Sequence, residues 1–141
     1  MAHFGLAWLL LCVALGIHVV DEALTDFLSV YNPAVRAIRR RIPFLPLPTF
    51  SFRVWLAGLI FATTLLLCLT PFAWRAASWM TPLSYAFAIL MLGNGLLHVL
   101  GSLYMKRMMP GVYSAPLLLV GSIYLLVATP AWTCPFSVTA F

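Results

Sequence analysis

Long apolar runs, separated by short polar clusters, dominate this chain of 141 residues. Four runs are long and apolar enough to be helices that cross a membrane, because a hydrocarbon core of about 30 Å requires about 20 helical residues. They extend over residues 4–28, 52–70, 83–104 and 115–129, each to within a few positions. None shows the period-two alternation of a membrane barrel strand. The pattern predicts an all-α integral membrane four-helix bundle, formed as a single transmembrane domain over residues 1–141.

Prolines and one threonine predict where the later helices begin and end. Pro71 is expected to end the second helix and Pro130 the fourth. Thr81 is the expected cap of the third helix, with Pro82 at its first position. The third helix also carries small residues that allow a neighbouring helix to approach closely: Gly93, Gly95 and Gly101.

The segment after the first apolar run has the pattern of a short amphipathic helix over residues 33–42. Asn32 is its expected cap, with Pro33 at the first position. One face is apolar (Val35, Ile38 and Ile42), and arginines fill much of the remainder: Arg36, Arg39, Arg40 and Arg41. This interfacial helix has two possible roles. It either anchors the chain on anionic lipid, or forms a basic mouth that recruits the anionic head group of a substrate.

The composition supports membrane residence. Only 8% of the residues are charged, whereas soluble domains average about 25%. Seven of the eight basic residues lie in the first and third loops: Arg36, Arg39, Arg40, Arg41, Arg53, Lys106 and Arg107. Because basic loops stay on the inner side of a membrane, we expect both loops to be cytoplasmic and both termini outside. The basic excess then sets topology, so no nucleic-acid partner is expected.

Ionisable and polar residues gather towards the end of the first apolar run. They follow the spacing i, i+3, i+4, i+7 and i+8, which places them on one arc of roughly 140°: His18, Asp21, Glu22, Thr25 and Asp26. An acidic side chain at the bilayer centre costs about 2.5–3.5 kcal/mol. Asp21 and Glu22 therefore indicate a site, and two adjacent carboxylates need a cation to stay ionised in a dry setting.

The third helix supplies partners at the same depth. Asn94 and His98 are spaced i, i+4, as are His18 and Glu22. His18 lies 14 residues into the first helix, and His98 lies 15 residues into the third. Both helices run in the same direction in the predicted topology, so the two histidines should sit at nearly one level. We expect His18, Glu22, Asn94 and His98 to converge.

Three motifs in order resemble the HXXEE-domain family of small bacterial membrane proteins. They are HVVDE at residues 18–22, NGLLH at residues 94–98 and MMPGVYSAPLLL at residues 108–119. The resemblance implies a location in the cytoplasmic (inner) membrane and the following site residues: His18, Glu22, Asn94, His98, Pro110 and Gly111. Asp21 departs from the first Glu of the family motif. The resemblance implies no reaction.

The residue types favour a metal-dependent membrane enzyme acting on a hydrophobic or amphiphilic, lipid-like substrate. His18, Glu22 and His98 would be the metal ligands, a nitrogen and oxygen set that suits Zn or non-haem Fe. Asp21 would orient a ligand or act as base, and Asn94 would hydrogen-bond the substrate or a bound water.

Two alternatives stay open. The first is a metal-free acid–base isomerase or cyclase of a lipid-soluble substrate, in which His18 and Glu22 transfer the proton. The second is a non-catalytic assembly or binding subunit, or a small ion carrier, because His and carboxylate chains also form proton relays. A unit this small could also form a homo-oligomer or need a partner membrane chain.

Overall fold

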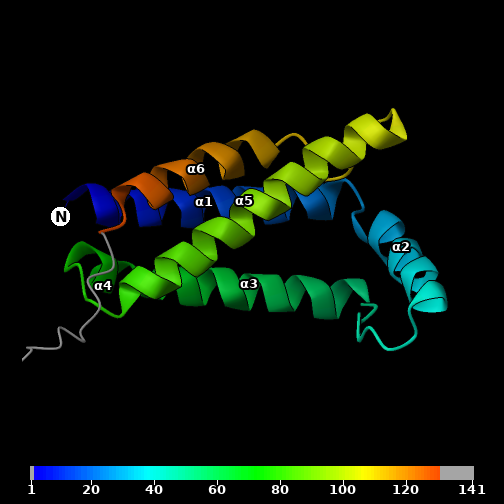
Figure 1. Cartoon of the computed structure of the whole chain (residues 1–141), viewed down its shortest axis with the longest axis horizontal. Helices are drawn as coiled ribbons and strands as arrows, with labels where there is room; N and C mark the ends of the chain where they lie inside the picture. The colour runs from blue at the N-terminus through cyan, green and yellow to red at the C-terminus, as the bar shows by residue number, and fades with distance from the viewer. Residues whose placement is uncertain (1, 131–141) are drawn as a thin grey trace, which may run out of the picture.

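The computed structural model describes residues 2–130, and every regular element in that range is an α-helix (Figure 1). The elements are α1 (Ala2–Leu24), α2 (Leu28–Arg41), α3 (Phe52–Cys68), α4 (Thr70–Trp74), α5 (Met80–Met105) and α6 (Ala115–Ala128). The all-α prediction is therefore confirmed for this part of the chain.

Three of the helices are long and apolar enough to cross a membrane: His3–Leu24, Phe52–Trp74 and Met80–Met105. The middle one joins α3 and α4. Helix α6 has only 14 residues, which at 1.5 Å per residue is about 21 Å and shorter than the hydrocarbon core. By length alone, the structure thus supports three of the four predicted spans.

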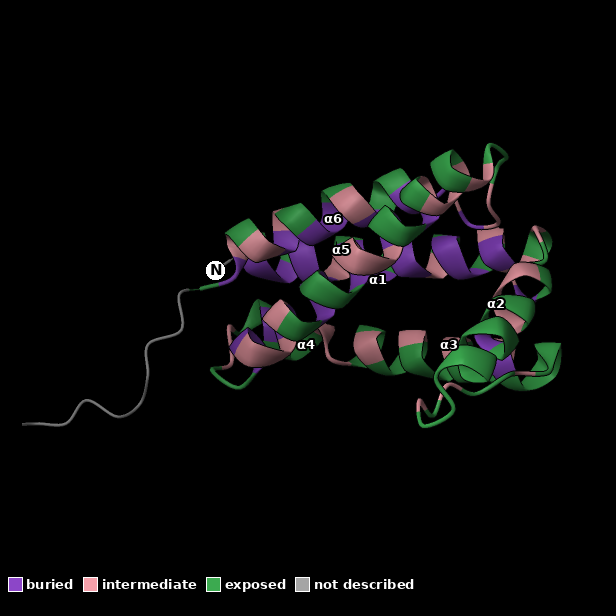
Figure 2. Cartoon of the chain, turned by 45° about the vertical axis from the view of Figure 1, so that its right-hand side comes forward, coloured by how far each residue is buried: buried purple, intermediate pink, exposed green. Residues whose placement is uncertain are grey.

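Helix α1 lies at the centre of the packing. It packs against α6, α4 and α3, and α5 packs along α6, so that α1 and α6 run side by side while α5 crosses them obliquely (Figure 1). Buried residues accordingly concentrate on α1 and on the faces turned towards it (Figure 2). Trp8 is fully buried against Phe87, and its indole N–H donates to the carbonyl of Leu66 over 3.0 Å. That bond ties α1 to α3.

Of the glycines expected to allow close helix contact, only Gly95 does so. A Cβ atom there would lie 3.0 Å from Leu119 Cδ2 of α6. Gly93 has no neighbour within 4 Å of such an atom, and Gly101 faces Met109 in the loop that follows α5. The predicted role was therefore wrong for Gly93 and Gly101, because neither lies on the face that packs against a helix.

Helix α1 ends at Leu24, four residues before the predicted boundary. Asp26 has a positive φ of 56°, a left-handed conformation that ends a helix and that Asp tolerates better than most residues. The hydroxyl of Thr25 also turns back to bond the carbonyl of Asp21. The polar cluster thus ends the helix as well as forming the site.

Helix α2 begins at Leu28, earlier than predicted, and Pro33 lies inside it. Asn32 is not its cap. The Asn32 amide instead donates to the carbonyl of Phe50 and accepts from the Phe50 N–H, over 2.9 and 3.0 Å. This clamp joins α2 to the segment that enters α3.

Two other boundaries differ from the prediction. Pro71 does not end the second helix, because α4 starts at Thr70 with this proline in its first turn, where a missing N–H is tolerated. Helix α5 starts at Met80, so Thr81 lies inside it and Trp79 occupies the cap position without a side-chain bond. Helix α6 matches the prediction to one residue.

The two ends of the molecule differ in character. Helix α2 and the end of α5, with the predicted basic loops, lie at one end, and α4 lies at the other (Figure 1). Trp74 and Trp79, both exposed, belong to the α4 end. The arrangement agrees with the loop pairing expected from the charge pattern.

Candidate metal centre

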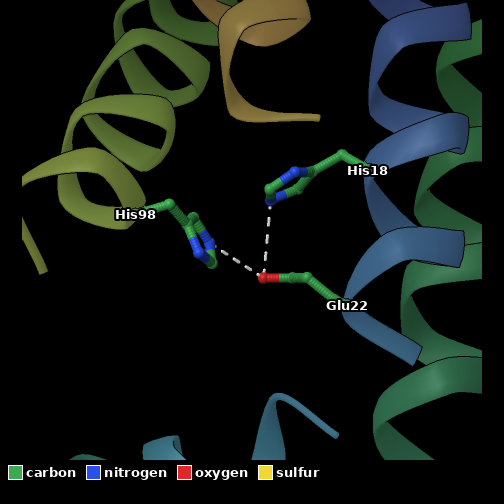
Figure 3. A group of neighbouring side chains, drawn as sticks. All are labelled: His18, Glu22 and His98. Atoms are coloured by element: carbon green, nitrogen blue, oxygen red, sulfur yellow. Dashed lines mark ion pairs between the residues drawn. The ribbon is translucent and has the colours of Figure 1, made fainter. Parts of the chain in front are cut away.

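Three buried ionisable side chains meet near the basic end of the bundle (Figure 3). His18 and Glu22 project from one face of α1, one turn apart, and His98 projects from α5. Glu22 Oε1 lies 3.5 Å from Nε2 of His18 and 3.0 Å from Nε2 of His98. Each of the three offers a ligand atom within 4.8 Å of the others. The predicted convergence of the two histidines is confirmed, with ring centroids 4.7 Å apart.

A serine and an aspartate fix the orientation of His18. The Ser114 hydroxyl lies 2.7 Å from Asp21 Oδ2 and 2.8 Å from Nδ1 of His18. The Ser114 N–H also donates to the same carboxylate oxygen over 2.9 Å. When Asp21 is ionised and so only accepts, the hydroxyl donates to Asp21 and accepts the Nδ1 proton of His18. Nε2 of His18 is then left with a free lone pair.

A backbone carbonyl does the same for His98. Its Nδ1 lies 2.6 Å from the carbonyl oxygen of Pro110, which can only accept, so Nδ1 carries the proton. The remaining nitrogen, Nε2, points at Glu22. Metal-binding histidines commonly donate their outer N–H to a carboxylate, a carbonyl or water in this way.

Three acceptor atoms face one another at the centre of this cluster when the outer nitrogen of each histidine carries the proton. A carboxylate oxygen faces two imidazole nitrogens whose protons are held on the outer side, and lone pairs at this distance repel each other in a buried setting. A divalent cation or additional shared protons would remove the repulsion. The three ligand atoms thus lie close enough together to hold a metal ion.

The loop between α5 and α6 closes one side of the cluster. Gly111 has a φ of +85°, and a Cβ atom there would lie 2.7 Å from His98 Cε1 and 2.9 Å from Glu22 Cγ. Its N–H donates to the hydroxyl of Thr25 over 3.2 Å. Only glycine combines this conformation with this closeness, so the loop backbone forms a wall of the site.

Comparison with known proteins places the chain in a family. The family model described as a protein of unknown function with HXXEE motif matches residues 8–125, which is most of the chain. The chain belongs to the HXXEE family. The resemblance drawn from the three motifs is thus confirmed. No curated protein and no solved structure matched the chain.

The HXXEE motif divides its residues between two tasks in this structure. Its His and final Glu, His18 and Glu22, point into the cluster, whereas Asp21, at the first Glu position, bonds Ser114. Asp21 therefore contacts the cluster only through Ser114, and the shorter side chain still reaches its partner. Asp26 is exposed and outside the cluster.

Asn94 borders the cluster on the α5 side. Its amide nitrogen donates to Nε2 of His18 over 3.2 Å, which agrees with a lone pair on that atom. The residue is partly exposed, unlike the buried His18 and His98. Asn94 thus lies at the partly exposed edge of the cluster. The aromatic ring of Phe27 lies nearby, 5.5 Å from the ring of His98.

Sequence reasoning missed Ser114. Its position before Ala115 is typical of a helix cap, and it does precede α6, but its side chain makes no capping bond. It lies inside the third motif, so the family resemblance held the only signal in the sequence.

Proposed function

We propose that this HXXEE protein is a membrane-embedded, metal-dependent enzyme that acts on a hydrophobic or amphiphilic, lipid-like substrate. One observation carries the proposal: Nε2 of His18, Nε2 of His98 and Oε1 of Glu22 converge while each histidine has its outer nitrogen bonded elsewhere. Ligand atoms around a tetrahedral ion at about 2.1 Å lie about 3.4 Å apart. The two distances of 3.5 and 3.0 Å are close to that spacing.

The ligand set suits either of two metals, Zn or non-haem Fe, as the single bound ion. Two histidines and one carboxylate with an open position suit catalytic Zn or the facial triad of non-haem Fe. Such an ion would activate a water or polarise a substrate oxygen. Binding it at His18 would free the amide of Asn94, which we place against the substrate or the bound water. Asp21 would hold His18 in position through Ser114.

Membrane residence is part of the proposal. Three helices are long and apolar enough to span, and α3 is the least buried of them, which leaves its surface for lipid, a second copy or a partner membrane chain. Following the charge pattern, we place both termini outside and the basic loops in the cytoplasm of a cell with this protein in its inner membrane.

Two apolar clefts support a lipid-like substrate. A cleft of about 370 Å³ lies between α1 and α3, and its α1 wall includes Val19 and Ala23, the sequence neighbours of His18 and Glu22. A second, of about 320 Å³, is lined by aromatic residues that include Phe27 and Trp55. Both favour hydrocarbon over a polar substrate.

A metal-free reaction is the second candidate. The separation of 3.0 Å between His98 Nε2 and Glu22 Oε1 is short enough for a direct proton-sharing bond. In that case the pair would move a proton on a lipid-soluble substrate, and activity would survive exhaustive chelation. A non-catalytic assembly role would leave a His18→Ala, Glu22→Ala double variant functional.

Elemental analysis of detergent-purified protein, prepared without chelator, tests the proposal. We expect about one Zn or Fe per chain in the wild type and none in His18→Ala or His98→Ala. His3→Ala is the matched control, because His3 is exposed at the start of α1, and it should keep the metal. Wild-type protein that contains no metal and cannot be loaded with Zn²⁺ or Fe²⁺ would contradict the proposal.

A further inference from the structure

Three arginines of α2 form a basic hollow at the end of the molecule. Arg36, Arg39 and Arg40 follow the spacing i, i+3, i+4 and therefore share one helix face. Together with Pro43 they line a cavity of about 340 Å³. All three are exposed, as is most of this helix (Figure 2).

Among the described residues, no acidic side chain forms an ion pair with these arginines. The chain has three acids. Glu22 lies in the metal cluster, Asp21 accepts from Ser114, and Asp26 is in the turn before α2. Within residues 2–130 the arginines of the hollow form no ion pair. Three like charges on one hollow repel each other, so an external anion would stabilise them.

The helix dipole offers a partial explanation of why arginines gather at the end of α2. Positive side chains in the last turn are stabilised by the free carbonyl groups there, and Arg39, Arg40 and Arg41 occupy that turn. Arg36 lies a turn earlier and is not accounted for. The helix dipole therefore accounts for Arg39 and Arg40 but not for Arg36.

The helix that carries the hollow is held in place. Both sides of the Asn32 amide bond the backbone of Phe50, and the Tyr31 hydroxyl donates to the carbonyl of Pro48 over 3.2 Å. Leu28 and Val35 are buried on the neighbouring face, which Arg39 borders one turn after Val35. These contacts hold the helix that carries the three arginines.

We infer that Arg36, Arg39 and Arg40 bind the phosphate of an anionic lipid head group. Helix α2 joins the ends of α1 and α3 (Figure 1), so it lies at head-group level when those helices span a bilayer. Arginine forks bind phosphate oxygens in pairs. Ile38 and Ile42, partly exposed on α2 or next to it, provide contacts for the acyl region. The inference rests on the proposed membrane residence but not on the metal.

Native mass spectrometry in detergent, with titration of phosphatidylglycerol or phosphatidylcholine, tests this site. We expect wild-type protein to bind phosphatidylglycerol at least ~10-fold more tightly than phosphatidylcholine. Each arginine near an anionic head group contributes about a fivefold factor to the affinity. The variant Arg36→Gln, Arg39→Gln, Arg40→Gln should lose this preference. The matched control Arg53→Gln, Lys106→Gln, Arg107→Gln removes the same charge elsewhere and should keep it.

Other outcomes would overturn the site. If both triple variants lost the preference for phosphatidylglycerol equally, overall charge, and not the hollow, would attract the lipid. Equal binding of the two lipids by the wild type, or displacement of phosphatidylglycerol by inorganic phosphate, would also contradict a lipid head-group site. Replacement of the three arginines by lysine keeps the charge but removes the guanidinium groups that bind phosphate oxygens in pairs. For this variant we expect a preference for phosphatidylglycerol that is weaker than that of the wild type and stronger than that of the glutamine variant. Metal content measured on the same samples separates failure here from failure of the metal proposal.

Discussion

Nδ1 of His18 lies 2.8 Å from the hydroxyl oxygen of Ser114, although 96 residues separate them in the chain. The bond turns the other nitrogen of His18 towards Glu22 and His98 (Figure 3). The start of α6 thereby controls the orientation of a side chain on α1. The cluster depends on this long-range contact as much as on its own three residues.

Removing the Ser114 hydroxyl should weaken metal binding without removing a ligand. We expect Ser114→Ala to lower metal affinity by about 10–100-fold, the usual effect of losing an outer hydrogen-bond partner. Competition with a chromophoric chelator measures it. Ser122→Ala is the matched control, because Ser122 is also buried on the same segment but its hydroxyl has no partner among the described residues. An unchanged affinity in Ser114→Ala would show that the serine does not orient His18.

The three acids should differ in their effect on metal binding. Glu22→Gln should abolish it, because the ligand oxygen loses its charge. Asp21→Asn should weaken it by about 10-fold or more through Ser114, and Asp26→Asn should have no effect, since Asp26 is exposed. Isothermal titration calorimetry with Zn²⁺ measures the affinity of each variant and so ranks the three acids. Complete loss in Asp21→Asn would instead make Asp21 a ligand.

Gly111→Ala should be destabilising. The left-handed conformation costs a non-glycine residue about 1–3 kcal/mol, and the added Cβ would overlap His98 and Glu22. We expect a lower thermal unfolding temperature in detergent together with loss of metal. Gly93→Ala is the control: its Cβ meets nothing within 4 Å, and alanine favours a helix by about 1 kcal/mol. Equal behaviour of the two variants would argue against the loop as a wall of the site.

Breaking the clamp of α2 should loosen that helix alone. Asn32→Ala removes two hydrogen bonds to Phe50, each with a net contribution of about 0.5–1.5 kcal/mol. Hydrogen exchange should therefore rise in α2 and remain unchanged in α5. Tyr31→Phe, which removes one bond to Pro48, should have a smaller effect. Faster exchange throughout the molecule would mean that Asn32 supports the whole fold.

Chelation should destabilise the wild-type protein. A metal that binds only the folded state stabilises it by mass action, so its removal should lower the unfolding temperature. His98→Ala, which has already lost a ligand, should show no further change on chelation. A wild-type unfolding temperature that does not respond to chelator or to added Zn²⁺ would favour the metal-free reading.

The sequence alone predicted the helices and most of the cluster. Long apolar runs bounded by polar residues and prolines predict where helices lie, and α6 was located to one residue. The helical period placed His18 and Glu22 on one face, and equal depth paired them with His98. These inferences need only the helix geometry and the width of a bilayer.

Tertiary packing decided what local patterns leave open. Asn32 and Ser114 both resemble helix caps, yet neither makes a capping side-chain bond, because Phe50 and Asp21 supply other partners for them. A polar side chain has several possible local and distant partners, and only the packed chain selects one. The fold likewise brought the Gly111 backbone against His98. The sequence thus determined which residues meet in the cluster, and the contacts between distant segments decided how each is held.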